Sequence, residues 1–120
     1  MSIKITELKP VQLSIEPTTN LLLVKQGNNT VKLTRDSVIG MKRLREGFYK
    51  EGVYTSSLIP RNRFTIDENG TITIVCNDEY ESNSVKIYNH KKLDDLERIN
   101  EFVNKNKASI AWEREFKRRY

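Results

Sequence analysis

The sequence predicts an α+β protein whose sheet is mostly antiparallel. Two stretches, from Leu21 to Leu33 and from Arg63 to Asn77, alternate apolar and polar residues around turn residues, as β-hairpins do. Helical spacing of apolar residues follows in residues 35–46 and 90–119, and this order of elements is typical of the α+β class. With 120 residues, we expect a single domain, plus a basic C-terminal helix over residues 108–120 that either docks on it or stands apart.

The best-defined stretch is the hairpin around Asn69-Gly70. A two-residue loop would split its apolar side chains between the two faces, whereas a three-residue loop with Gly70 in the left-handed region pairs Phe64 with Ile74. Burial therefore favours the second register. It places the following residues on one inner face: Phe64, Ile66, Ile72, Ile74 and Cys76. It leaves these on the outer face: Thr65, Asp67, Thr71 and Thr73.

The N-terminal part predicts an edge strand and a second hairpin. Val11, Leu13 and Ile15 alternate between two prolines, which suits a sheet edge. Gly27-Asn28 is typical of a type II′ turn, because that turn needs glycine at its first central position. The resulting register pairs two sets of apolar residues on one face: Leu22 with Leu33, and Val24 with Val31.

The first helix is expected over residues 35–46, with Thr34 as its N-cap and Gly47 as its C-terminal stop. Gly40 interrupts this helix and indicates close packing against the sheet. The predicted buried stripe consists of Val38, Met41, Leu44 and Phe48.

Between the helices the sequence predicts a short strand or loop over residues 52–62, an acidic loop over residues 78–83 and a strand over residues 84–88. Asn89 is the expected cap of the second helix, over residues 90–119, which is either continuous or broken near 104–108. Its predicted buried residues are Leu93, Leu96, Ile99 and Val103.

Residues 29–33 and 83–87 share a short pattern, Asn-Thr-Val-Lys-Leu against Asn-Ser-Val-Lys-Ile. A match this short is expected by chance, but a true repeat would imply two strand–strand–helix halves. The expected helix, three strands and helix over residues 35–106 also occur in double-stranded-RNA-binding domains. The rest of that family's pattern is absent, so no family is assigned.

No convergent catalytic set is visible, and we expect a protein that is not an enzyme and needs no cofactor or metal. The single cysteine, Cys76, excludes an internal disulfide, and with the single histidine, His90, it excludes the usual zinc clusters. We expect Cys76 to be a buried, inert thiol. No apolar run approaches the roughly 20 residues of a membrane span and no signal peptide opens the chain, so the expected location is the cytoplasm, with no membrane.

The formal net charge of +5 and the pI near 9.4 are compatible with a nucleic-acid partner. Three groups of basic residues are candidate phosphate contacts. The first is Lys42, Arg43 and Arg45; the second is Arg61 and Arg63; the third is Arg114, Lys117, Arg118 and Arg119. Sequence alone does not place them on one surface.

Three aromatic residues, Trp112, Phe116 and Tyr120, recur every four residues among the C-terminal cations. They either pack on the sheet or anchor a protein partner or a second copy of the chain. Two hypotheses follow. One is a nucleic-acid-binding or regulatory protein, and the other is a protein-binding accessory factor, such as an inhibitor, adaptor or assembly protein of a phage or mobile element. Clustered cations on the outer face of the sheet would favour the first, and an exposed apolar patch the second.

Overall fold

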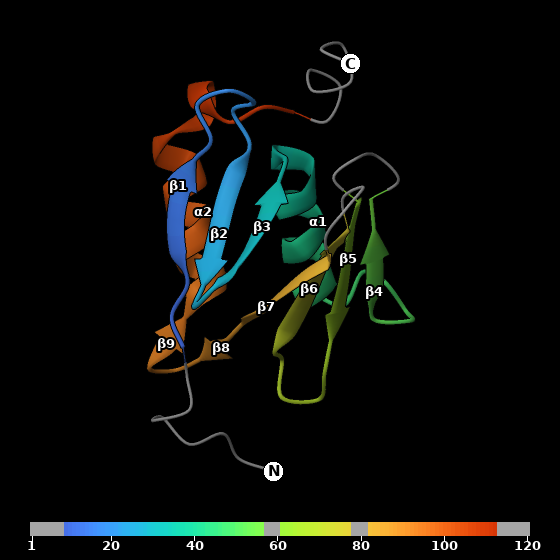
Figure 1. Ribbon diagram of the computed structural model, residues 1–120. Helices are drawn as coiled ribbons and strands as arrows, with labels where there is room; N and C mark the ends of the chain where they lie inside the picture. The colour runs from blue at the N-terminus through green and yellow to red at the C-terminus, as the bar shows by residue number, and fades with distance from the viewer. Residues whose placement is uncertain (1–8, 57–60, 78–81, 113–120) are drawn as a thin grey trace.

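The computed structural model describes residues 9–56, 61–77 and 82–112 (Figure 1). Within them, strands and helices follow in the order β1 (Gln12–Ile15), β2 (Leu22–Gln26), β3 (Asn29–Leu33), α1 (Arg35–Arg45), β4 (Val53–Thr55), β5 (Arg61–Ile66), β6 (Ile72–Asn77), β7 (Ser82–Ile87), β8 (Asn89–His90), β9 (Leu93–Asp94) and α2 (Asp95–Lys105), before a 3₁₀ turn, Lys107–Ser109. The strands form three antiparallel sheets, β1-β2-β3, β4-β5-β6-β7 and β8-β9. The predicted α+β class is confirmed.

Both predicted hairpin registers are confirmed. In the three-stranded sheet Leu22 pairs with Leu33, and Gly27 has a φ of 62° at the predicted turn position. In the four-stranded sheet Phe64 pairs with Ile74, and Gly70 has a φ of 81°. The Asp67 carboxylate closes that loop by accepting from the Asn69 and Thr71 N–H groups, at 2.9 and 3.0 Å.

The predicted faces of the central hairpin hold, with one exception. Phe64, Ile72 and Ile74 are fully buried, and Cys76 is buried as expected. Thr71, which we expected on the outer face, is buried at 5% exposure. It precedes β6 and belongs to the loop held by Asp67, so strand alternation does not determine its direction.

Helix α1 begins as predicted, with the Thr34 hydroxyl accepting from the Ser37 N–H at 3.3 Å. Val38, Met41 and Leu44 are buried. The prediction that Phe48 continues this stripe is wrong, because its side chain is 67% exposed. The helix ends before it, and Gly47, with a φ of 84°, turns the chain so that Phe48 leaves the helical spacing.

Gly40 lies against the ring of Tyr54 in β4, as the prediction of close packing required. A Cβ at this position would lie 2.6 Å from the Tyr54 Cε2 atom. The ring has little room to move, because it packs on Phe64 with ring centroids 5.3 Å apart. This contact explains a glycine within a helix.

We expect Gly40→Ala to destabilise the protein, because the overpacking cost of about 1–3 kcal/mol exceeds the helix-propensity gain of up to about 1 kcal/mol. In a Tyr54→Ala background, the same substitution should raise the free energy of unfolding, since only the propensity gain remains. Urea denaturation of the two single variants and the double variant measures this change of sign. Equal effects of Gly40→Ala in both backgrounds would contradict the packing explanation.

The second helix begins later than predicted. Asn89 does not cap it, because Asn89 and His90 pair with Asp94 and Leu93 as the small β8-β9 ladder. Asp94 is the cap instead, and its carboxylate accepts from the Glu97 N–H at 3.1 Å. Helix α2 therefore starts at Asp95.

The second helix ends at Lys105, which confirms the alternative of a break near 104–108, but no α-helix begins at residue 108. After the 3₁₀ turn, Ile110 and Ala111 are buried. The Ala111 N–H donates to the Asn20 carbonyl at 2.9 Å, and its carbonyl accepts from the Arg35 N–H at 3.1 Å. These backbone bonds hold the segment against the domain. The rest of the predicted C-terminal helix, residues 113–120, lies outside the described residues.

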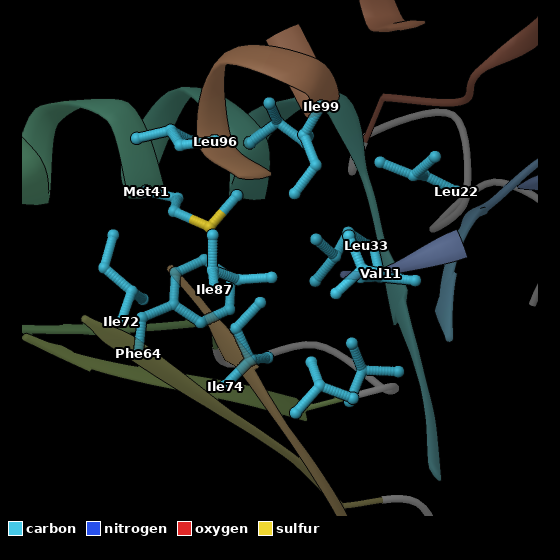
Figure 2. Packing of buried hydrophobic residues seen from close by; sticks show 14 of the residues in the cluster. Val11, Leu22, Leu33, Met41, Phe64, Ile72, Ile74, Ile87, Leu96 and Ile99 are labelled. Atoms are coloured by element: carbon cyan, nitrogen blue, oxygen red, sulfur yellow. The ribbon is translucent and has the colours of Figure 1, made fainter. Parts of the chain in front are cut away.

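The two larger sheets meet where β3 lies beside β7, and these strands run in opposite directions (Figure 1). Gln26 joins the sheets, since its Nε2 donates to the Lys86 carbonyl at 2.9 Å and its Oε1 accepts from the Lys86 N–H at 3.0 Å. Both sheets and both helices contribute to one core (Figure 2). Neither helix of the described residues is long and apolar enough to cross a membrane.

Strands β3 and β7 are the two strands that share the short sequence pattern. Strand β3 is the third strand of its sheet and directly precedes α1, whereas β7 is the fourth strand of its sheet and is followed by β8 and β9 before α2. The two strands therefore have different surroundings in the fold, and an internal repeat stays a prediction. Four strands, β4 to β7, form the main sheet between the two helices, where we expected three.

Candidate nucleic-acid interface

One face of the four-stranded sheet carries three exposed cations. In β5, Arg61 and Arg63 are exposed and alternate with the buried residues Asn62 and Phe64. Helix α1 covers the inner face, to which Phe64 points, so both arginines project from the outer face.

Lys86 in β7 joins the two arginines. It is exposed between the buried residues Val85 and Ile87, and its partner in the neighbouring strand β6 is Thr73. Lys86 lies two strands away from Arg63 and is displaced by two residues along the strand direction. With ordinary strand spacing, this register gives a distance of about 12 Å between the two Cα atoms. We call Arg61, Arg63 and Lys86 the basic face. Sequence analysis missed Lys86, although its alternation with Val85 and Ile87 was a detectable signal.

No ion pair of the described residues involves a cation of the basic face. Strands β4 to β7 contain no aspartate or glutamate. The described ion pairs involve other cations: Lys32 with Glu16, Arg45 with Asp94, and Arg98 with Asp95. The connecting residues 78–81, which include three carboxylates, lie outside the described residues. The strands themselves therefore present positive charge alone, among hydroxyl and amide side chains.

The other predicted basic groups do not join this face. Lys42, Arg43 and Arg45 belong to α1, which packs on the inner face of the same sheet. Arg45 is engaged with the Asp94 carboxylate through two contacts, of 3.3 and 3.2 Å. The third group, Arg114, Lys117, Arg118 and Arg119, lies outside the described residues, as do Phe116 and Tyr120. The structure thus separates the first two groups onto opposite sides.

A second feature is a groove of about 330 Å³ between the two helices. Helix α1 lines it with Arg35, Val38, Ile39 and Lys42, and α2 with Asn100, Val103 and Asn104. Lys107 and Trp112 close it beyond the end of α2. Residues three and four apart share a helix face, so both helices present a single stripe to this interhelical groove.

Arg35 is held in a defined position at this groove. Its Nη1 donates to the Lys107 carbonyl at 3.0 Å, and its guanidinium carbon lies 4.2 Å from the centroid of the Trp112 ring. Trp112 was expected as an anchor or a core residue, and the structure places it at the groove, partly exposed. Sequence analysis missed Arg35 as a site residue, because only its contact with Trp112, far along the chain, distinguishes it.

The Cys76 thiol and the His90 imidazole do not come together. Cys76 lies near the C-terminal end of β6, where it pairs with Asn62 of β5. His90 comes shortly after β7, whose last residue, Ile87, pairs with Ile72 at the N-terminal end of β6. The length of β6 separates the two ends by about 13 Å. In residues 9–56, 61–77 and 82–112, no three His, Cys, Asp or Glu side chains converge to hold a metal ion.

Asp95 is the buried carboxylate of the described chain, and it forms an ion pair with Arg98. Its Oδ1 accepts from Arg98 Nη1 at 2.8 Å, and Arg98 Nη2 donates to the Val11 carbonyl at 3.0 Å. The pair thereby ties α2 to the residue before β1. Burial raises the pKa of Asp95 above its ordinary value, and the Arg98 guanidinium opposes that rise.

This raised pKa predicts a pH dependence with a definite sign. The folded protein holds the Asp95 proton more tightly than the unfolded chain, so this contribution to stability is complete at pH below about 3.8 and is lost as pH rises through the folded pKa. Asp95→Asn removes the titration. We therefore expect the free energy of unfolding of the variant, relative to the natural protein, to increase from acidic to neutral pH. Urea denaturation at both pH values measures it, and a decreasing difference would contradict this assignment.

Comparison of the chain with protein-family models, curated protein sequences and solved structures finds no match. The basic face and the interhelical groove are therefore the two features from which a function is inferred.

Proposed function

We propose that the protein binds nucleic acid without acting as an enzyme, and that it does so through the basic face. The observation that supports this is the presence of three exposed cations on one face of four strands that contain no carboxylate. Cationic side chains that neutralise phosphates release condensed counterions, which is the main source of affinity in sequence-independent binding.

The surroundings of the three cations suit phosphate and sugar contacts. Thr65 and Thr73 lie opposite one another across β5 and β6, and Ser84 lies opposite Val75 across β6 and β7. Hydroxyl groups donate hydrogen bonds to phosphate oxygens, which positions a protein on a nucleic acid without reading its sequence. The aromatic side chains of β4 and β5, Tyr54 and Phe64, pack together on the inner face.

These strands therefore provide no aromatic platform on which bases could stack. From this we infer binding to the sugar-phosphate backbone with little sequence preference. The proposed setting is the cytoplasm, where a thiol such as Cys76 stays reduced.

The test compares two triple variants that remove the same charge. Arg61→Gln, Arg63→Gln and Lys86→Gln together should weaken binding of labelled DNA and RNA more than tenfold, measured by fluorescence anisotropy. Lys42→Gln, Arg43→Gln and Lys50→Gln together are the control, since these exposed residues lie in or after α1. Circular dichroism spectra of the two triple variants check that each is folded. Equal weakening by the two variants would show that net charge, rather than the basic face, determines binding.

The interhelical groove supports a second candidate function, the binding of a protein partner. Trp112 and the exposed side chain of Ile39, at 40%, give this groove an apolar component that the basic face lacks.

A further inference from the structure

The interhelical groove combines positive charge with an apolar floor. Three of its lining residues, Arg35, Lys42 and Lys107, are cationic, and none of its described lining residues is acidic. Val38 is almost fully buried beneath it, at 2% exposure, whereas Ile39 on the same stripe is 40% exposed. A large aliphatic side chain that remains exposed beside a tryptophan marks a surface suited to apolar contact.

Arg35 is prepared to bind a carboxylate. One guanidinium N–H group is used by the Lys107 carbonyl, and the guanidinium carbon lies over the Trp112 ring. A guanidinium has five N–H donors, so others remain for an acceptor in the groove. Because the side chain is already held in place, binding a carboxylate costs less conformational entropy than it would for a mobile arginine.

The chemistry of the groove indicates its occupant. The apolar floor favours a partner that inserts aliphatic or aromatic side chains, and the cations around it favour carboxylates on the same partner. Asn100 and Asn104 of α2 add amide groups that can bond to a peptide backbone. A nucleic-acid backbone provides the negative charge but no apolar side chains.

We propose that this groove binds an acidic, amphipathic segment of a partner protein. Arg35, Lys42 and Lys107 pair with its carboxylates, and Ile39 and Trp112 contact its apolar side chains. Helix α1 packs on the inner face of the four-stranded sheet, so the groove and the basic face use different sides of the molecule. The inference is therefore independent of the proposed nucleic-acid binding, and either can fail without the other.

The first measurement is a selection that assumes no partner sequence. A phage-displayed library of random dodecapeptides is selected on the intact protein. We expect enrichment of peptides that combine aspartate or glutamate with leucine, isoleucine or phenylalanine at helical spacing. Selected peptides without acidic enrichment would overturn the proposal, and so would a selection that yields no binding peptide.

The second measurement locates the site with the intrinsic fluorescence of Trp112, which is the single tryptophan of the chain. A synthetic peptide from the selection should change the Trp112 emission in a saturable way. Lys42→Glu with Lys107→Glu should weaken this binding about tenfold or more. Lys25→Glu with Lys91→Glu is the control with the same charge change at two exposed lysines, and it should leave the affinity unchanged.

Two further comparisons make the result decisive. Replacing every acidic residue of the peptide with lysine should abolish binding, whereas the triple variant of the basic face should bind the peptide normally. Equal losses in the Lys42/Lys107 and Lys25/Lys91 variants would overturn the proposal. A labelled oligonucleotide that displaces the peptide and changes the Trp112 emission would also overturn it, by placing nucleic acid in the groove.

Discussion

Replacing Phe64 with alanine is expected to lower the free energy of unfolding by about 3–5 kcal/mol. Its side chain is fully buried, and its partner across the central hairpin is Ile74 (Figure 2). Its ring also packs on the Tyr54 ring. The removed ring loses its burial and leaves a cavity between the four-stranded sheet and α1. A domain of this size has a total stability of about 5–15 kcal/mol, so the variant should be close to unfolding.

Phe48→Ala is the matched control, because it makes the same chemical change at a side chain that is 67% exposed. We expect an effect within about 0.5 kcal/mol, as for other surface substitutions. Urea denaturation followed by circular dichroism measures both variants. Similar losses for the two would contradict the placement of Phe64 in the core and of Phe48 at the surface.

The second large effect is on the salt dependence of nucleic-acid binding. Each phosphate contact contributes a log–log slope of about −0.9 on duplex DNA, so three contacts from the basic face predict a slope near −2.7. Raising the salt concentration from about 50 to about 200 mM should then weaken binding about 40-fold. On single strands, where each contact contributes about −0.7, the weakening should be about 18-fold.

The triple variant of Arg61, Arg63 and Lys86 should lose this dependence, because the side chains that displace counterions are gone. The triple variant of Lys42, Arg43 and Lys50 should retain it. A slope that persists in the first variant would mean that other residues make the phosphate contacts, and the four tail cations Arg114, Lys117, Arg118 and Arg119 would be the next to replace.

The hairpins were predictable because their information is local. The pairing of Phe64 with Ile74 follows from the loop residues and from the need to bury one face of the hairpin. The structure has this pairing. Helix boundaries were less predictable. Phe48 fits the helical spacing of α1, but Gly47 ends the helix first. Asn89 is a good cap residue, but it is used in pairing with Asp94, and this competition is invisible without the three-dimensional structure.

The candidate sites were predictable only in part. Arg61 and Arg63 were identifiable as cations in a strand, but the side they share with Lys86 depends on which face α1 covers. The interhelical groove was not predictable, because Arg35 and Trp112 are far apart in the sequence and meet only when the segment after α2 pairs with the start of α1.

Chemical-shift mapping detects directly whether nucleic acid contacts the outer face of the four-stranded sheet, as we propose. Isotope-labelled protein is titrated with a short duplex and with a single-stranded oligonucleotide, and the backbone amide shifts are followed. We expect the largest changes at Arg61, Arg63 and Lys86 and their neighbours on the outer face, with little change at Lys42 and Trp112. Changes concentrated at Lys42 and Trp112, or no change at low salt, would contradict it.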